Sequence, residues 1–164
     1  MVITKNDFET FGEYTAIYLK NGLFTVISTK SLELVMPYTW CMEGTGYVMS
    51  RTGGKAVKMH RIITGAQKGD YVDHIDRNPL NNTLTNLRLC KKQQNEFNTK
   101  IRSDSTTGYK GVSFSKSKNK YRSYINKDGH YYHLGYFNTK EEAALTYNQK
   151  AISLFGEYAR LNEI

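Results

Sequence analysis

The chain has 164 residues, of which 39% are hydrophobic, and this content is enough for a packed core and excludes a wholly disordered protein. A mean hydropathy of −0.59, no run of 18 apolar residues and no signal-peptide pattern at the N-terminus exclude a membrane-spanning or secreted class. Lys and Arg number 23 against 15 Asp and Glu, and the resulting net charge of +8 is concentrated after residue 60. This distribution fits a polyanionic partner, and it also fits charge that only keeps the protein soluble.

The two cysteines are far apart in the sequence and form no Cys-x-x-Cys pair: they are Cys41 and Cys90. This spacing excludes a disulfide-stabilised scaffold and predicts no structural zinc site. Two unpaired thiols suit a reducing compartment, so we expect a soluble, cytoplasmic protein.

The first 59 residues predict a small β layer. Two strands within residues 13–30 join at Asn21-Gly22, because this dipeptide tolerates the positive φ angles of a tight hairpin turn. Residues 31–36 predict a short helical turn, and residues 46–50 predict one further strand. The expected core residues of this layer are Phe24, Val26, Trp40 and Tyr47.

The middle of the chain combines strands with a polar loop. After a short apolar-rich element at residues 57–64, strands are predicted at residues 71–76 and 87–90. The segment between these strands, residues 77–86, is rich in Asn and Pro and is typical of an ordered loop. Residues 91–98 are polar and straight-chained, which predicts a helix, so the order is strand, loop, strand, helix.

Four polar residues of this segment have the chemistry that phosphodiester hydrolysis requires. His74 follows Asp73 at the end of a predicted strand, and Asn86 and Asn95 follow in the loop and the helix. A histidine can take a proton from water near neutral pH, while carboxylate and amide oxygens suit a hard divalent cation. A carbonyl oxygen must accept from the other ring nitrogen of His74 to fix its tautomer, and the Asn86 amide could brace the loop. Taken alone, Asp73 and His74 also fit a hydrogen-bonded pair without a catalytic role.

Residues 71–95 resemble the HNH nuclease motif of phage and intron-encoded homing endonucleases, with the sequence YVDHIDRNPLNNTLTNLRLCKKQQN. The His, Asn and Asn of that motif match His74, Asn86 and Asn95. The resemblance implies a ββα-metal fold in which His74 is the general base, Asp73 and Asn95 hold the catalytic cation, and Asn86 is the structural member of the catalytic motif. The implied cofactor is Mg²⁺, with Mn²⁺ able to substitute, and no structural zinc is expected.

Basic residues on both sides of the motif are candidate DNA contacts. Residues 59–63, MHRII, are similar to the His-Arg segment of these endonucleases, which makes His60 and Arg61 candidates for phosphate binding. Lys91 and Lys92 could follow a DNA backbone from the predicted helix. A packed helix residue at position 60 and a solvated helix face at the two lysines are the other interpretations.

The polar linker at residues 101–107 divides the chain into an N-terminal region, residues 1–100, and a C-terminal domain, residues 108–164. Apolar and polar residues alternate in three segments of that domain, which predicts a three-stranded antiparallel meander over residues 109–116, 120–127 and 130–137. A capping box of Thr139 and Glu142 predicts the start of a helix.

Residues 108–164 resemble the APETALA/ethylene-response-factor type of DNA-binding domain through GYKGVSFSK, KYRSYI, HLGYF and KEEAALTYNQKAISLFGEYARLN. The resemblance implies that the sheet lies in the DNA major groove, supported by the helix. Alternation predicts the side chains that pack on the helix: Val112, Phe114, Tyr121, Ile125, Tyr132 and Leu134. The side chains expected to face DNA are Ser113, Ser115, Arg122, Tyr124, Asn126, Tyr131 and His133, with Lys116, Lys118 and Lys120 near phosphates. The base preference of the plant domains is not carried over, because Ser113, Ser115 and Tyr121 depart from their pattern.

These features predict an α+β protein, in which an N-terminal β layer with a ββα-metal HNH nuclease module precedes a three-stranded antiparallel sheet packed on one helix. The predicted function is that of a site-recognising, metal-dependent endonuclease of the homing type, acting on double-stranded DNA as a monomer or homodimer. One active site is expected to nick one strand. A phage-encoded protein of this kind would act in the cytoplasm of a bacterial host cell.

Three other functions fit the same sequence. A non-catalytic DNA-binding regulator with an idle HNH fold would be indifferent to His74→Ala. An RNA-directed or structure-selective nuclease would prefer RNA or branched substrates, and a phage packaging protein would associate stably with a larger partner. Intact motif spacing favours a nuclease over the regulator, and the C-terminal sheet favours duplex DNA over RNA.

Overall fold

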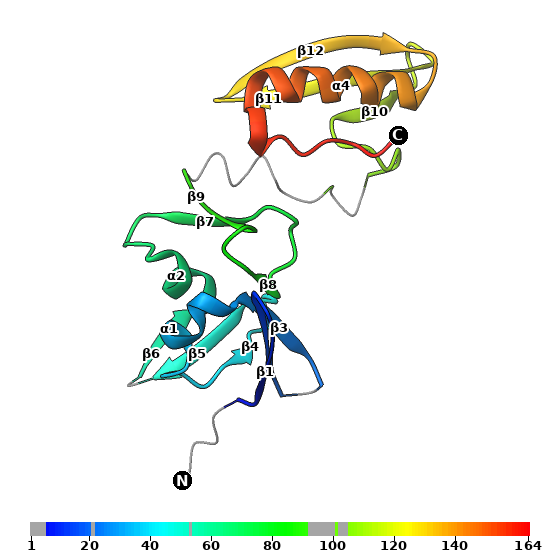
Figure 1. Ribbon diagram of the computed structural model, residues 1–164. Helices are drawn as coiled ribbons and strands as arrows, with labels where there is room; N and C mark the ends of the chain where they lie inside the picture. The colour runs from blue at the N-terminus through cyan, green and yellow to red at the C-terminus, as the bar shows by residue number, and fades with distance from the viewer. Residues whose placement is uncertain (1–5, 21, 53, 92–100, 102–104) are drawn as a thin grey trace. The chain divides into compact units, whose positions relative to one another are not determined.

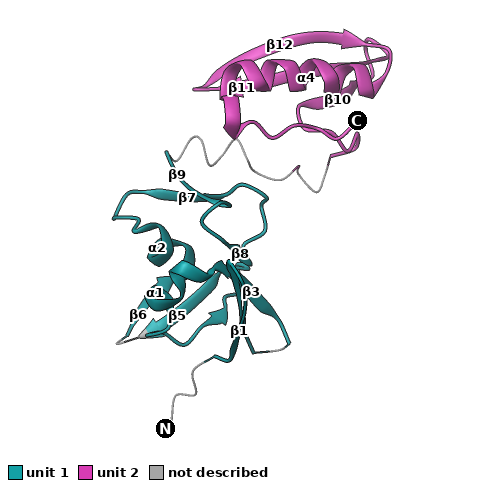
Figure 2. Ribbon diagram, in the orientation of Figure 1, with its two compact units in different colours: residues 1–95 teal, residues 96–164 magenta. Residues whose placement is uncertain are grey.

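The computed structural model describes residues 6–20, 22–52, 54–91, 101 and 105–164, with the side chain of Thr52 excepted. These residues form a mixed α+β structure with four small sheets (Figure 1). Contacts divide the chain into two units, Met1–Asn95 and Glu96–Ile164, which Figure 2 colours separately. No helix among the described residues is long and apolar enough to cross a membrane.

The first unit begins with a sheet of strand order β1-β2-β3-β8. Its first three strands form an antiparallel meander: β1 (Phe8–Phe11), β2 (Tyr14–Tyr18) and β3 (Phe24–Ser28). Strands β2 and β3 pair antiparallel on either side of the predicted hairpin turn, of which Asn21 lies outside the described residues. The short strand β8 (Asn81–Asn82) comes from the polar loop and pairs with β3 in parallel. The loop is thereby attached to the N-terminal sheet.

A second sheet and three helical turns complete the support of the first unit. After η1 (Thr29–Ser31) and α1 (Leu32–Val35), the second sheet contains β4 (Cys41–Met42), β5 (Val48–Thr52) and β6 (Lys55–Lys58). Helix α2 (Met59–Thr64) follows directly and ends at Gly65, which adopts the left-handed conformation that glycine favours. Helix α1, together with the end of η1, confirms the helical turn predicted at residues 31–36.

The core of the first unit lies among these elements, and Trp40 is its largest fully buried side chain. The indole Nε1 donates to the carbonyl of Val35 at 2.9 Å, which satisfies the one polar atom of the ring. The prediction that Phe24 belongs to the core is wrong, because its side chain is 50% exposed. Alternate residues of a strand face opposite sides, and Phe24 shares the outer face with Tyr14, whereas its neighbour Thr25 is buried.

Strands β7 (Tyr71–His74) and β9 (Leu87–Cys90) form a two-stranded antiparallel sheet on either side of the polar loop (Figure 1). The register places Asp73 opposite Arg88. Both predicted strands are confirmed, and the helix predicted at residues 91–98 lies outside the described residues apart from Lys91.

The second unit contains the predicted meander and helix. Its strands are β10 (Val112–Ser115), β11 (Lys120–Lys127) and β12 (His130–Phe137), antiparallel in that order. Helix α4 (Lys140–Phe155) covers one face of this sheet and leads into η2 (Gly156–Tyr158). The capping box is present, with the Thr139 hydroxyl accepting from the backbone of Glu142 and the Glu142 carboxylate accepting from that of Thr139.

Five of the six side chains predicted to pack on α4 do so: Val112, Tyr121, Ile125, Tyr132 and Leu134. Phe114 is the exception. It lies on the edge strand β10, its side chain is 44% exposed, and its ring contacts that of Tyr121 on β11. At Gly111, by contrast, the close approach of α4 leaves no room for a side chain. A Cβ there would collide with the Tyr147 ring and the Tyr124 carbonyl, and φ is +70°.

Candidate active site

The end of β7 places His74 among two other rings. The His74 side chain is buried, with 6% exposure, and its ring centroid lies 5.2 Å from that of His60 on α2. The ring of Tyr47 lies 5.9 Å from His74 and 5.1 Å from His60. Sequence reasoning assigned Tyr47 to the core of the β layer and did not place it beside His74, because strand periodicity shows the face of a residue but not its distant neighbours.

The Asn82 amide determines which nitrogen of His74 carries the proton. Its Oδ1 lies 3.2 Å from Nε2 of His74, and its Nδ2 donates to the Pro79 carbonyl at 3.0 Å. A carbonyl can only accept, so the amide nitrogen must face Pro79 and the amide oxygen must face His74. Nε2 of His74 therefore donates, and Nδ1 has the basic lone pair. The sequence analysis expected a carbonyl oxygen that accepts from one ring nitrogen of His74, and in the structure the amide oxygen of Asn82 has this position.

Burial keeps His74 in the form that a general base requires. Burial lowers the pKa of His74 below its ordinary value, and this effect exceeds the opposing influence of the Asn82 hydrogen bond and the Asp76 and Asp73 charges. The imidazole is consequently neutral at pH 7 and can accept a proton at Nδ1.

Asp73, the predicted metal ligand, is buried and forms an ion pair. Its Oδ2 accepts from Nε of Arg88 at 2.9 Å and from an Nη atom of the same guanidinium at 2.6 Å. The charge of Arg88 compensates the buried carboxylate across the β7–β9 ladder. Sequence reasoning did not select Arg88, although its position opposite Asp73 in a two-stranded ladder would have indicated it.

The chemistry of Asp73 fits a divalent cation, because a carboxylate next to the base is a hard oxygen ligand. The second predicted ligand, Asn95, lies outside the described residues, as does the predicted DNA contact Lys92. Among the residues that the structure describes, no group of three or more His, Cys, Asp or Glu side chains is arranged to hold a metal. A cation at Asp73 would thus depend on one carboxylate, one amide and non-protein ligands.

Asn86 holds the loop between β7 and β9 in shape. Its Oδ1 accepts from the backbone of Asp76 at 2.9 Å, and its Nδ2 donates to Oδ1 of Asp76 and to the Asn81 carbonyl, both at 2.8 Å. The Ile75 N–H donates to the Asn86 carbonyl at 2.9 Å. These bonds fix the chain immediately after His74, which agrees with the bracing role that the sequence suggested.

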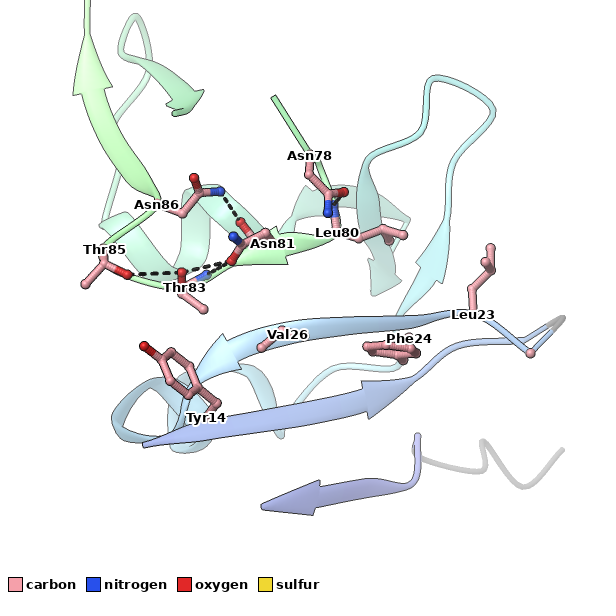
Figure 3. A pocket seen from close by; sticks show the side chains of 11 residues that line it. Tyr14, Leu23, Phe24, Val26, Asn78, Leu80, Asn81, Thr83, Thr85 and Asn86 are labelled. Carbon is pink, nitrogen blue, oxygen red and sulfur yellow. Dashed lines mark hydrogen bonds between the residues drawn. The ribbon is translucent and has the colours of Figure 1, made fainter. Parts of the chain in front are cut away.

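A groove of about 600 Å³ borders the same loop (Figure 3). One wall is the outer face of β2 and β3, with Tyr14, Phe24 and Val26, and the other is formed by loop residues including Asn78 and Asn86. None of its lining residues is charged. Phe24 is exposed because its side chain lines this groove and is not packed in the core.

The predicted phosphate contacts on α2 are His60 and Arg61, and both side chains make contacts within the first unit. His60 is buried, and its Nδ1 has no hydrogen-bond partner among the described residues. The Arg61 guanidinium donates to the carbonyls of Asp70 at 2.8 Å and Gln67 at 2.7 Å, which braces the turn before β7. DNA contact by these two residues stays a prediction, as it does for Lys91, which is exposed at the end of the described segment.

The buried His60 is expected to make the first unit less stable in acid. Burial lowers the pKa of His60 to about 3, assisted by His74 where that ring is protonated and by the positive charges of Lys58 and Arg61. Because its pKa is lower in the folded than in the unfolded state, its contribution to stability is complete above pH 6.5 and is lost as the pH falls toward 3. Between pH 7 and pH 5 the loss is about 2 kcal/mol.

Urea unfolding at pH 7 and pH 5, followed by the fluorescence of Trp40, measures this loss. The protein has one Trp, and it lies in the core of the first unit. His60→Gln should reduce the difference between the two pH values by about 2 kcal/mol and leave the part due to His74, whose pKa burial also lowers, whereas His130→Ala, at an exposed hairpin turn, should leave the difference intact. Equal pH dependence in His60→Gln and the unmodified protein would contradict the assignment.

In the second unit, side chains predicted to face DNA come together on the sheet face opposite α4. The Arg122 guanidinium lies 5.1 Å from the Tyr124 ring centroid, and the Tyr124 and Tyr131 rings stack at 5.6 Å. Arg122 also donates to the Ser113 hydroxyl at 3.3 Å. His133 lies on the same surface with its ring 4.8 Å from Tyr136, a residue that the sequence analysis omitted.

The other predicted contacts of this surface differ in exposure. Ser115 is half-buried, Asn126 is exposed at the far part of β11, and the three lysines of the β10–β11 turn region are all exposed: Lys116, Lys118 and Lys120. We call the residues Ser113, Arg122, Tyr124, Tyr131 and His133 the aromatic–basic face. The geometry offers a stack of flat side chains beside a cation.

Comparison with known proteins gives related sequences for both parts of the chain. A family model described as HNH endonuclease matches residues 57–97. An uncharacterised HNH endonuclease of Acanthamoeba polyphaga mimivirus is 38% identical over 157 residues, covering 92% of this chain and 81% of that protein. Protein 3.8 of Escherichia phage T7 is 38% identical over 93 residues, covering 57% of this chain and 76% of that protein. No solved structure matches the chain.

Proposed function

Because this chain belongs to the HNH endonuclease family, we propose that it is a homing-type, divalent-metal-dependent endonuclease that recognises a site in double-stranded DNA and nicks one strand per active site. The observation that supports this most directly is the fixed tautomer of His74 beside Asp73. Asn82 accepts from Nε2, so the ring presents a basic lone pair at Nδ1, and Asp73 directly precedes His74 on β7.

In the proposed reaction, Nδ1 of His74 takes a proton from a water molecule. The water oxygen forms a bond to phosphorus, and the bond from phosphorus to the 3′ oxygen breaks in line with the attack. The products are a 5′-phosphate and a 3′-hydroxyl, which receives a proton from solvent. Asp73 and Asn95 would hold Mg²⁺, or Mn²⁺ in its place, and the cation would neutralise charge on the scissile phosphate and the leaving oxygen. Asn86 supports the reaction by keeping the loop after His74 in place.

The second unit would supply DNA affinity and much of the site choice, in the manner of an APETALA/ethylene-response-factor-like domain. Its aromatic–basic face combines a guanidinium with stacked tyrosines, which suits phosphate and base-edge contacts. The exposed lysines beside β10 would add phosphate contacts. One active site per chain cuts one strand, so a monomer nicks, and a double-strand break needs a homodimer or two events. We place this activity in the cytoplasm of the infected host cell.

Incubation of supercoiled plasmids carrying candidate target sites with the purified protein tests the proposal. With Mg²⁺ we expect conversion to open circles, and with EDTA none. Linear product at early times would indicate paired active sites in place of single nicks. A protein that shifts the same DNA in a gel but never cuts it, with Mg²⁺ or Mn²⁺, would contradict the nuclease and support the regulator.

Substitution of the aromatic–basic face is expected to weaken DNA binding without changing cleavage chemistry. Arg122→Ala should cost about 1–3 kcal/mol of binding free energy and reduce the salt dependence of the affinity. Lys150→Ala removes one charge from α4, on the opposite side of the sheet, and is the matched control. Fluorescence anisotropy with labelled duplex at several salt concentrations measures both. Equal losses in the two variants would refute specific binding by this face.

A further inference from the structure

We propose that Thr25, in the N-terminal sheet, is a positioning residue for His74 and acts through Asn82. Thr25 and His74 are far apart in the sequence and lie on β3 and β7, yet hydrogen bonds join both to the same buried amide. The proposal rests on the role of His74 as general base. It gives the N-terminal β layer a part in the chemistry besides support.

The first step is the orientation of Asn82, which is fully buried. Its Nδ2 donates to Oγ1 of Thr25 at 2.9 Å and to the Pro79 carbonyl at 3.0 Å, which uses both amide hydrogens. Its Oδ1 is then directed at Nε2 of His74. If the amide were rotated by 180°, its oxygen would face the Pro79 carbonyl and its hydrogens would face the protonated Nε2 of His74. The hydrogen bonds of Asn82 would then be lost in a buried site, which is energetically unfavourable.

The second step is the polarity of the Thr25 hydroxyl, which is also fully buried. The hydroxyl has one hydrogen and donates it to the Leu80 carbonyl at 2.7 Å. Its oxygen must therefore accept from Asn82, so the direction of every bond from Leu80 to His74 is determined. The Leu80 carbonyl also accepts from the backbone of Val26 at 2.9 Å, next to the parallel pairing of β3 and β8.

The third step is the consequence for the base. In the opposite tautomer, the Nε2 lone pair of His74 would face the Asn82 oxygen, and the hydrogen would occupy Nδ1. Two lone pairs would then meet in a buried, poorly solvated place, which disfavours that tautomer. The sheet thus favours the reactive tautomer, and loss of the Thr25 hydroxyl leaves the Pro79 carbonyl as the acceptor that still orients the Asn82 amide.

The test combines a spectroscopic readout with cleavage kinetics on the full chain. Long-range ¹H–¹⁵N correlation spectra of protein labelled with ¹⁵N at histidine distinguish a protonated Nε2 from a protonated Nδ1. The His74 signals are assigned by their loss in His74→Gln. At pH 8 we expect the Nε2–H form in the unmodified protein and a mixture of tautomers in Asn82→Ala. Single-turnover cleavage by Asn82→Ala should be about 10–100-fold slower, with unchanged DNA affinity.

Two substitutions at Thr25 form a matched pair. Thr25→Val keeps the shape and removes the hydroxyl, whereas Thr25→Ser keeps the hydroxyl and removes a methyl group. We expect Thr25→Val to shift the tautomer in the same direction as Asn82→Ala but to a smaller extent, because the Pro79 bond remains, with a smaller loss of rate. Thr25→Ser should resemble the unmodified protein in both. If Asn82→Ala does not fold, the comparison of Thr25→Val with Thr25→Ser still tests whether the Thr25 hydroxyl controls the tautomer of His74.

The proposal is overturned if folded Asn82→Ala keeps the Nε2–H form, or if Thr25→Val and Thr25→Ser have the same tautomer. An unmodified protein with a protonated Nδ1 would overturn it as well. The spectra require no activity, so a protein that never cuts DNA would contradict the proposed function while the tautomer measurement still decides the role of Thr25.

Discussion

His74→Ala is expected to lower the rate of metal-dependent DNA cleavage by about 10²–10⁴-fold, the usual contribution of a general base. The expected loss follows from removal of the Nδ1 lone pair, the proposed proton acceptor, which the Asn82 bond to Nε2 leaves on Nδ1. DNA affinity should be unchanged, because the proposed affinity comes mainly from the second unit. Single-turnover cleavage of supercoiled plasmid, together with anisotropy for binding, separates rate from affinity.

His130→Ala is the control for this experiment. His130 lies at the exposed β11–β12 turn, where its Nδ1 contacts the Asp128 carbonyl at 3.1 Å, and no catalytic or DNA-binding role is assigned to it. It should cleave at the rate of the unmodified protein. If His74→Ala also keeps that rate while folded, the observed cleavage arises from another site or a contaminating nuclease.

Asp73→Ala is expected to abolish cleavage and to lower the free energy of unfolding by about 3–5 kcal/mol, since it leaves the Arg88 guanidinium buried without its partner. The two effects have different origins. The stability loss is expected from an uncompensated charge, whereas the activity loss is expected from removal of the proposed metal ligand. Urea unfolding followed by Trp40 fluorescence measures the first, and the plasmid assay measures the second.

A double variant separates the two effects. Asp73→Leu combined with Arg88→Met replaces the ion pair by apolar side chains of similar size, and such replacements are often neutral for stability. We expect it to unfold near the midpoint of the unmodified protein and yet to cut no DNA with Mg²⁺. Recovery of cleavage in this double variant would show that Asp73 serves only to balance Arg88.

Local patterns were sufficient for most of the secondary structure. Alternation predicted β11 and β12, and the Thr139 and Glu142 spacing predicted the start of α4, because these signals depend on neighbours along the chain. Alternation was not sufficient at Phe114, which is 44% exposed on the edge strand β10, or at Phe24, which borders a groove. Whether a face is covered depends on the rest of the fold, which periodicity does not contain.

The sequence by itself determined the residue types and spacing of the candidate site, namely Asp73-His74 followed by an Asn-rich loop and Asn86, and the polyanion-binding charge of the chain. Only the tertiary structure decided which nitrogen of His74 is basic, that Arg88 compensates Asp73, and that Thr25 reaches the loop. The reason is physical. Motif spacing reflects chemistry along one segment, whereas a tautomer and a buried charge are set by partners that meet only when β3 pairs with β8 and β7 with β9.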